Sequence, residues 1–268
     1  MSSAELLSQE VPVYNLEGAE QSKIPLPEFF KTPIRVDLIR RAFLAAFTAR
    51  LQPKGSDPLA GLRTTAESLG VGHGIARVAR IKGGMRAARV VQAVKGRRAH
   101  PPKVEKILLE RINKKEKKLA LASALSATAD RNVVVKRGHI VPEKPLPIIV
   151  SNDLEKINRA AQLRDILKKL GVWLDIERAQ EGIRVRAGKG KLRGRKYKKP
   201  RSVLIVVSDH KELSKAANNM PGVEVVNARQ LSVLHLAPGG VPGRLTLYTE
   251  GALKVLEERL QEVKVMNK

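Results

Sequence analysis

Residues 202–207, SVLIVV, contain five consecutive apolar side chains. A strand with one face in water alternates apolar and polar residues, whereas this run offers no polar side chain to solvent. Such a run is typical of a strand in a parallel sheet that is covered by helices on both faces. It therefore predicts an α/β protein.

Other segments on both sides of this run extend the same pattern. Short apolar runs predict further strands at 11–18 (VPVYNLEG), 146–150 (LPIIV), 222–228 (GVEVVNA) and 244–249 (RLTLYT). Between them, segments with helical periodicity lie at 33–47, 113–130, 153–171, 210–219 and 250–260. Strands that alternate with helices predict a three-layer α/β/α sandwich.

Local signals mark the beginnings of the predicted helices. Thr32 is the expected N-cap of the first helix, with Pro33 at its first position. Asn113, with Glu116 three residues later, resembles a capping box. Residues 101–112, PPKVEKILLERI, predict an additional helix that has prolines at its entry.

The charge of the chain limits its partners. There are 51 Lys and Arg residues against 26 Asp and Glu, a formal net charge of +25. Such an excess predicts a dense polyanion as the partner, either nucleic acid or an anionic membrane. The membrane is disfavoured because no apolar run approaches the roughly 20 residues of a spanning helix. An aromatic content of 3% predicts recognition of phosphates and folded shape rather than base stacking along a single strand.

Two segments concentrate the positive charge. About fifty residues, 53–102, lack a core-forming period, and within them 70–100 has eight Lys or Arg, many glycines and no acid. This segment repels itself and is expected to order only against a polyanion. A second cluster, 184–201, holds ten Lys or Arg without an acid and precedes the strand at Val203. We interpret it as a nucleic-acid contact rather than a solvated linker.

Motifs for catalysis or for cofactors are weak. The glycines at 70, 72 and 74 are not followed by a helix, as a dinucleotide fingerprint requires. Ser208 and Asp209 follow a predicted strand, where they are expected to cap the next helix rather than to react. The five histidines have no metal-ligand spacing, and the absence of cysteine excludes disulfides and thiolate sites. We expect no enzyme activity, no metal and no cofactor.

Four stretches in order carry a resemblance to a known family. QAVKGRRAHPPKVEK (92–106), LALASALSATAD (119–130), RAGKGKLRGRKYKKP (186–200) and LAPGGVPGRLTLYTEGAL (236–253) closely resemble the fourth protein of the large ribosomal subunit in its archaeal and eukaryotic form. The resemblance implies a body with a four-stranded parallel sheet, 1–52 and 103–268. It also implies a long non-globular extension, 53–102, that passes through ribosomal RNA to the polypeptide exit tunnel near its constriction.

The resemblance implies a structural protein that binds large-subunit RNA and supports its assembly. It also implies that three residues line the tunnel closest to the nascent chain: Arg77, Arg80 and Lys82. The residues expected to bind RNA are Arg63, His73, Arg86, Arg89, Lys95, Arg97, Arg98, His100, Lys103, Arg184, Arg186, Lys189, Lys191, Arg193, Arg195, Lys196, Lys198, Lys199, Arg201 and Arg244. For Arg244 a plain structural turn is an equally good interpretation.

The expected partners are large-subunit ribosomal RNA, neighbouring ribosomal proteins and the nascent polypeptide, with no membrane and no homo-oligomer. The first ten residues lack the basic region and apolar core of a signal peptide, so a cytoplasmic, ribosomal location is expected. The sequence also leaves two alternative functions open. One is a Rossmann-like enzyme with basic insertions that acts on a nucleotide or RNA, and the other is a chromatin-like protein that compacts DNA.

Overall fold

The computed structural model describes residues 10–264, which divide into two compact units. We call the first unit the body; it combines the residues up to Phe47 with those from Glu110 onward. The second unit, Thr48–Leu109, we call the arm. In the described part of the chain, no helix has both the length and the apolar composition that crossing a membrane requires.

The body is built on a mostly parallel sheet, as predicted, but the expected number of four strands is wrong. The sheet has six strands in the order β2-β1-β3-β8-β6-β7, and every neighbouring pair is parallel except β1 and β2. The strands are β1 (Glu10–Tyr14), β2 (Glu20–Pro25), β3 (Ile148–Val150), β6 (Leu204–Val207), β7 (Glu224–Asn227) and β8 (Thr246–Thr249).

The antiparallel edge strand β2 follows from a tight turn after β1. The side-chain oxygen of Asn15 accepts hydrogen bonds from the backbone N–H of Glu17 and of Ala19, at 3.0 and 2.9 Å. Gly18 has a φ of +80°, a conformation that glycine adopts without a steric cost. The β2 sequence, EQSKIP, is almost entirely exposed, so it carries no apolar alternation that could have predicted a strand.

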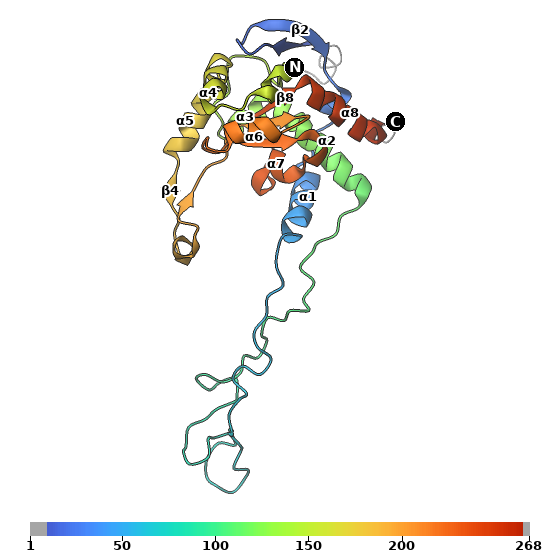
Figure 1. Cartoon of the computed structure of the whole chain (residues 1–268). Coiled ribbons are helices and arrows are strands. Elements are labelled where there is room, and N and C mark those ends of the chain that lie inside the picture. Colours follow the sequence, from blue (N-terminus) through green and yellow to red (C-terminus); the bar gives the residue numbers. More distant parts are fainter. Residues whose placement is uncertain (1–9, 265–268) are drawn as a thin grey trace. The chain divides into compact units, whose positions relative to one another are not determined.

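Helices cover both faces of the sheet (Figure 1). Along β6, Leu204 and Val206 join one apolar cluster, while Ile205 and Val207 join another on the opposite face. The first cluster includes α1 (Val36–Thr48), α2 (Lys114–Ala129), α7 (Val233–Leu236) and α8 (Glu250–Lys264). The second includes α3 (Arg131–Lys136), α4 (Ala160–Lys169), α5 (Trp173–Glu181) and α6 (Lys211–Ala217).

The predicted start of α1 is wrong by one turn. Thr32 ends the short 3-10 helix η2 (Glu28–Lys31), and α1 begins only at Val36. A contact from α2 explains the difference. The Ser123 hydroxyl donates to the Pro33 carbonyl at 2.9 Å and accepts from the Arg35 N–H at 2.6 Å. These two bonds satisfy backbone polar groups of residues 33–35 outside a helix, so they override the local capping signal.

The helix predicted at 101–112 is absent from the structure, which has no helix between Thr48 and Lys114. Its apolar residues Val104, Ile107 and Leu109 are exposed, and Ile107 is 85% exposed. An isolated helix of this length is marginal in water without an apolar face to pack on. Asn113 does occupy the N-cap position of α2, although its side chain makes no capping hydrogen bond.

The arm contains only isolated bridges, between Glu67 and Arg80 and between Arg80 and Ala87. The first and the last segments of the arm contact each other, for example through a 3.0 Å hydrogen bond from the Ser56 N–H to the Pro102 carbonyl. Within the arm, all of which the structure describes, only Ala66 and Ala88 are buried. Two alanines form no apolar core, so the arm has little intrinsic stability.

Candidate nucleic-acid interface

The arm presents a cationic surface with few acids to neutralise it. Its Asp and Glu residues number three, and two of these make surface ion pairs: Asp57 with Arg63 at 2.5 Å and Glu67 with Lys82 at 3.6 Å. Exposed pairs of this kind are weak and break readily when a stronger anion approaches. The thirteen Lys and Arg residues of the arm are Arg50, Lys54, Arg63, Arg77, Arg80, Lys82, Arg86, Arg89, Lys95, Arg97, Arg98, Lys103 and Lys106.

Arg80 differs from the other predicted arm residues. Its backbone exchanges two hydrogen bonds with Glu67, at 2.9 and 3.0 Å, and its guanidinium donates to the Met85 carbonyl at 2.5 Å. Arg80 is therefore half-buried and closes the turn at 81–86, whereas Arg77 and Lys82 on either side are exposed. In this conformation only the outer two of the three predicted tunnel-lining side chains face solvent.

Two predicted RNA-binding residues of the arm have an unusual backbone. Arg89 and Lys95 have φ values of +65° and +64°, in the left-handed region that residues with a Cβ rarely adopt. The Arg89 guanidinium also donates to the Ala66 carbonyl at 3.5 Å. Each such residue costs of order 1–3 kcal/mol, and such costs concentrate at binding sites.

The second cationic cluster forms a hairpin inserted between α5 and β6. We call residues 184–201 the basic hairpin; it contains strands β4 (Arg184–Val185) and β5 (Tyr197–Lys198) and the 3-10 helix η4 (Lys189–Arg193). Its ten Lys and Arg residues are exposed except Arg186. The Arg186 guanidinium donates to the carbonyls of Arg195 and Tyr197, at 3.0 and 3.5 Å. Arg186 thus helps to hold the two strands together.

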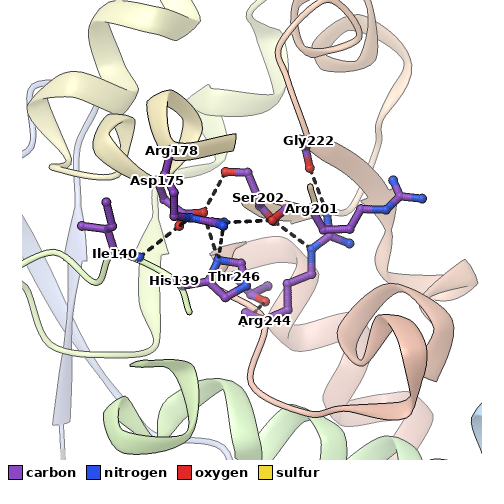
Figure 2. Close-up of polar contacts among 9 residues, drawn as sticks. All are labelled: His139, Ile140, Asp175, Arg178, Arg201, Ser202, Gly222, Arg244 and Thr246. Atoms are coloured by element: carbon purple, nitrogen blue, oxygen red, sulfur yellow. Dashed lines mark hydrogen bonds and ion pairs between the residues drawn. The ribbon is translucent and has the colours of Figure 1, made fainter. Parts of the chain in front are cut away.

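A buried carboxylate fixes the root of the basic hairpin (Figure 2). Asp175 of α5 has no exposed surface, and its two oxygens accept hydrogen bonds from four groups. The donors are His139 Nδ1 at 2.9 Å, the Ile140 N–H at 3.0 Å, Arg178 Nε at 2.8 Å and the Ser202 hydroxyl at 2.8 Å. Arg178 in turn donates to the Arg201 carbonyl at 3.0 Å. The residues that precede and follow the hairpin are therefore joined through one carboxylate.

The protonation states in this network follow from its geometry. Burial raises the pKa of Asp175, but hydrogen bonds from His139 and Arg178 outweigh burial and hold that pKa well below its usual range. Because the carboxylate can only accept, Nδ1 of His139 carries the proton. Burial lowers the pKa of His139 below its ordinary value, against the opposing hydrogen bond to Asp175. At neutral pH the pair is therefore a neutral imidazole beside a charged carboxylate.

The prediction that Arg244 binds RNA is wrong. Arg244 is 0% exposed, and its guanidinium is used inside the body. It donates to the carbonyls of Ser202, Gly222 and His235, at 2.9, 3.2 and 2.9 Å, and pairs with Glu224 at 2.5 Å. Arg201 also pairs with Glu224 but remains exposed, so Arg201 can still reach a partner.

The carboxyl edge of the sheet, where an α/β enzyme would place its reactive groups, is taken up by a structural carboxylate. Glu155 accepts hydrogen bonds from the Ser208 hydroxyl, the Thr249 hydroxyl and two backbone N–H groups, at 2.6–3.1 Å. Asp209 accepts from the Lys211 N–H at 3.3 Å at the start of α6. Among the described residues, 10–264, no group of three or more His, Cys, Asp or Glu could hold a metal ion.

The predicted contacts lie on two segments, the arm and the basic hairpin, except for Arg244, which lies inside the body. Arg80 and Arg186 are half-buried and Arg244 is buried. The other predicted residues are exposed: Arg63, His73, Arg77, Lys82, Arg86, Arg89, Lys95, Arg97, Arg98, His100, Lys103, Arg184, Lys189, Lys191, Arg193, Arg195, Lys196, Lys198, Lys199 and Arg201.

The sequence analysis missed cations of the arm and the carboxylate that fixes the root of the basic hairpin. Arg50, Lys54 and Lys106 are equally exposed cations at the ends of the arm. Their signal was the continuation of positive charge before the first glycine of the arm, Gly55, and past its last glycine, Gly96. Asp175 was also missed, and the signal for it is a carboxylate placed beside Ile176, on the apolar side of α5. A buried acid implies partners that neutralise and hydrogen-bond it.

Comparisons with known proteins agree with this geometry. Residues 24–259 match the model of the ribosomal protein L4/L1 family. The large ribosomal subunit protein uL4 of Methanocaldococcus jannaschii is 57% identical over 249 residues, covering 93% of this chain and 98% of that protein. The uL4 proteins of Aeropyrum pernix and Sulfolobus acidocaldarius are 57% and 52% identical, covering 94% and 96% of this chain and 93% and 97% of theirs.

Proposed function

The chain belongs to the ribosomal protein L4/L1 family, and from this premise we propose that its arm and its basic hairpin bind large-subunit ribosomal RNA at separate places. It is a structural protein of the large ribosomal subunit, not an enzyme, and it works in the cytoplasm within the ribosome. There it assembles with large-subunit RNA and with other ribosomal proteins.

The observation that carries this proposal is the composition of the arm. Thirteen cations lie on a segment with two buried residues and no helix or strand. Ordering a residue costs about 1–2 kcal/mol of backbone entropy, which two alanines cannot offset. Contacts with phosphates release condensed cations, and this release supplies the missing free energy. The arm therefore takes its final shape inside folded RNA.

Residues 77–86 are the part of the arm that we assign to the wall of the polypeptide exit tunnel, near its constriction. Arg77 and Lys82 are exposed there, and Arg80 between them closes the turn at 81–86. A nascent polypeptide that passes this turn would meet two positive charges. The glycines at 83 and 84 have open space around them, so the chain there can adapt to its surroundings.

A role in assembly follows from having two binding segments on one chain. The basic hairpin is fixed to the body through Asp175, whereas the arm gains its order from RNA. A chain that holds two RNA segments at once raises the effective concentration of one near the other. We therefore propose that the protein favours the folded arrangement of large-subunit RNA during assembly.

Directed cleavage of RNA tests the proposal. The chain has no cysteine, so a single introduced cysteine can carry a tethered iron–EDTA group without competing sites. Met85→Cys marks the arm and Leu192→Cys marks the basic hairpin, and both positions are exposed. Ser22→Cys on β2 is the control. In complexes of the full chain with large-subunit RNA, we expect two distinct sets of strong cleavages from positions 85 and 192. Cleavage no stronger than from position 22 would contradict the proposal.

A further inference from the structure

The basic hairpin carries one aromatic side chain among its ten cations. Tyr197 is 52% exposed, whereas the other two tyrosines of the chain, Tyr14 and Tyr248, are buried. The Lys196 ammonium lies 5.4 Å from the centre of the Tyr197 ring. An exposed ring within a surface that binds phosphates has no use in charge neutralisation. It therefore needs a separate explanation.

The pairing of the two strands gives the hairpin two different faces. Val185 lies directly opposite Tyr197, and Arg184 lies opposite Lys198. Directly paired residues project to the same face of an antiparallel ladder, and successive residues alternate between faces. Val185 is also exposed, at 56%. One face is thus aromatic and apolar, and the opposite face carries cations.

The ring is attached to a fixed backbone. Besides the strand pairing, the Arg186 guanidinium donates to the carbonyl of Tyr197 itself and to that of Arg195. The root of the hairpin is fixed by the Asp175 network. A ring held in this way loses little conformational entropy when a flat group stacks on it.

From these contacts we propose that Tyr197 stacks against an unpaired nucleobase of the bound RNA. The inference rests on the proposed RNA binding of the hairpin and adds to it a preference for a bulge or loop over a continuous duplex. In a duplex the base faces are covered by their neighbours, so a ring can stack only where a base is unpaired. The cations beside Tyr197 hold the phosphates that flank this base.

An apolar side chain of a neighbouring protein is the other conceivable partner for the ring. The charge around Tyr197 favours RNA, because all ten charged residues of the hairpin are basic. A surface beside this hairpin must therefore be strongly anionic, and RNA combines that charge with flat aromatic faces. Tyr197 would therefore contribute to the choice between RNA structures, while the neighbouring cations supply affinity for any RNA.

The test compares variants of the full chain on two RNA probes. One probe is a perfect RNA duplex, and the other is the same duplex with an internal bulge of unpaired adenosines. Affinities are measured by fluorescence anisotropy over a range of salt concentrations. Tyr197→Phe keeps the π face, whereas Tyr197→Ile keeps an apolar side chain with high strand propensity but removes that face. Leu192→Ala, at a position 82% exposed in η4, is the matched control for loss of apolar surface.

We expect the wild type, Tyr197→Phe and Leu192→Ala to bind the bulged probe more tightly than the duplex. Tyr197→Ile should lose about 5- to 140-fold in affinity for the bulged probe, with little change on the duplex. The slope of affinity against salt should stay the same, because no charge is removed. Far-UV circular dichroism checks that the variants fold equally.

Two outcomes would overturn the inference. One is a wild-type chain without preference for the bulge, and the other is a Tyr197→Ile chain that binds the bulged probe as tightly as the wild type.

The Lys198→Ala variant distinguishes failure of the stacking inference from failure of the proposed RNA binding. If that variant lowers the magnitude of the salt slope by about one while Tyr197→Ile changes nothing, RNA binding by the hairpin stands and only the stacking is wrong. In that case the ring contacts a protein neighbour.

Discussion

Asp175 and Ser202 are 27 residues apart in sequence, yet the Ser202 hydroxyl donates a 2.8 Å hydrogen bond to the buried Asp175 carboxylate. The basic hairpin lies between these two residues. Their bond joins α5 to the segment that enters β6, so it fixes both ends of a cationic insertion to the core. Arg178 strengthens the same junction through the Arg201 carbonyl.

The first prediction concerns the stability of this junction. Asp175→Ala leaves four donors without their acceptor and should lower the free energy of unfolding by about 3–5 kcal/mol. Ser202→Ala removes one bond to a charged group and should cost about 1.5–3 kcal/mol. Asp153→Ala is the control, because Asp153 forms an exposed pair with Lys156 at 2.9 Å and should cost less than about 1 kcal/mol. Urea unfolding followed by circular dichroism measures all three; equal losses for Asp175 and Asp153 would disprove the assignment.

The second prediction concerns pH. The fold lowers the pKa of His139. Below about pH 6.5, His139 is therefore protonated to a greater extent in the unfolded chain than in the folded chain. The low pKa of Asp175 acts in the same direction below about pH 4. Stability present at neutral pH is therefore lost as the pH falls. Arg178 and Arg137 both face His139 and disfavour its protonation.

A variant isolates the histidine contribution. His139→Gln keeps a donor for Asp175 but does not titrate, so its unfolding free energy should fall less than that of the wild type between pH 7.5 and pH 5.5 (about one pH unit on either side of the ordinary histidine pKa). Urea unfolding at these pH values gives the comparison. Parallel pH profiles for the two proteins would show that His139 does not contribute.

The third prediction separates Arg244 from the exposed cations. Arg244→Met removes a buried guanidinium that donates to three carbonyls and leaves Glu224 paired only with the exposed Arg201, so it should lower the free energy of unfolding by about 3–5 kcal/mol. Its salt slope for RNA binding should not change while the chain is folded. Arg184→Ala, in the exposed hairpin, should change the free energy of unfolding by no more than about 0.5 kcal/mol. The magnitude of its salt slope for RNA binding should fall by about one. A changed slope in Arg244→Met would restore Arg244 to the RNA contacts.

The fourth prediction concerns the electrostatic part of RNA binding by the hairpin. Replacing Arg193, Arg195 and Lys196 by alanine should lower the magnitude of the salt slope by about two to three units, since each neutralised phosphate contributes about 0.7–0.9. A triple alanine variant at exposed lysines outside both cationic segments, Lys23, Lys169 and Lys254, removes the same charge and serves as the control. Equal slopes for the two variants would mean that only net charge matters.

The fifth prediction concerns the independence of the body from the arm. Neither apolar cluster of the body contains a residue of Thr48–Leu109. Deletion of 70–95 should therefore leave the cooperative unfolding transition of the body intact and its midpoint in urea nearly unchanged. In ribosomes that contain the shortened chain, late assembly or passage of nascent chains through the tunnel should be impaired. Loss of the cooperative transition would show that the arm contributes to the folding of the body.

Much of the body could be predicted from local sequence. The continuous apolar runs at 146–150 and 203–207 correspond to β3 and β6, because a run without polar residues can be stable only between two covered faces. The segment 244–249, in which apolar and polar residues alternate, contains β8. The net charge of +25 predicted a polyanionic partner independently of the fold, because charge is a sum over residues. The mostly parallel α/β sheet and the ribosomal family both agree with what the sequence indicated.

Only the tertiary structure decided which polar side chains are buried. In sequence Arg244 looks like any other arginine beside glycines, and residues 101–112 have the period of a helix. Arg244 is buried because Glu224 and three carbonyls from distant segments surround it. No helix forms at 101–112, because Val104, Ile107 and Leu109 have no apolar surface to pack on. Charge and periodicity are local properties of the chain. The free energy of burying a charge or forming a helix depends on partners that only folding brings together.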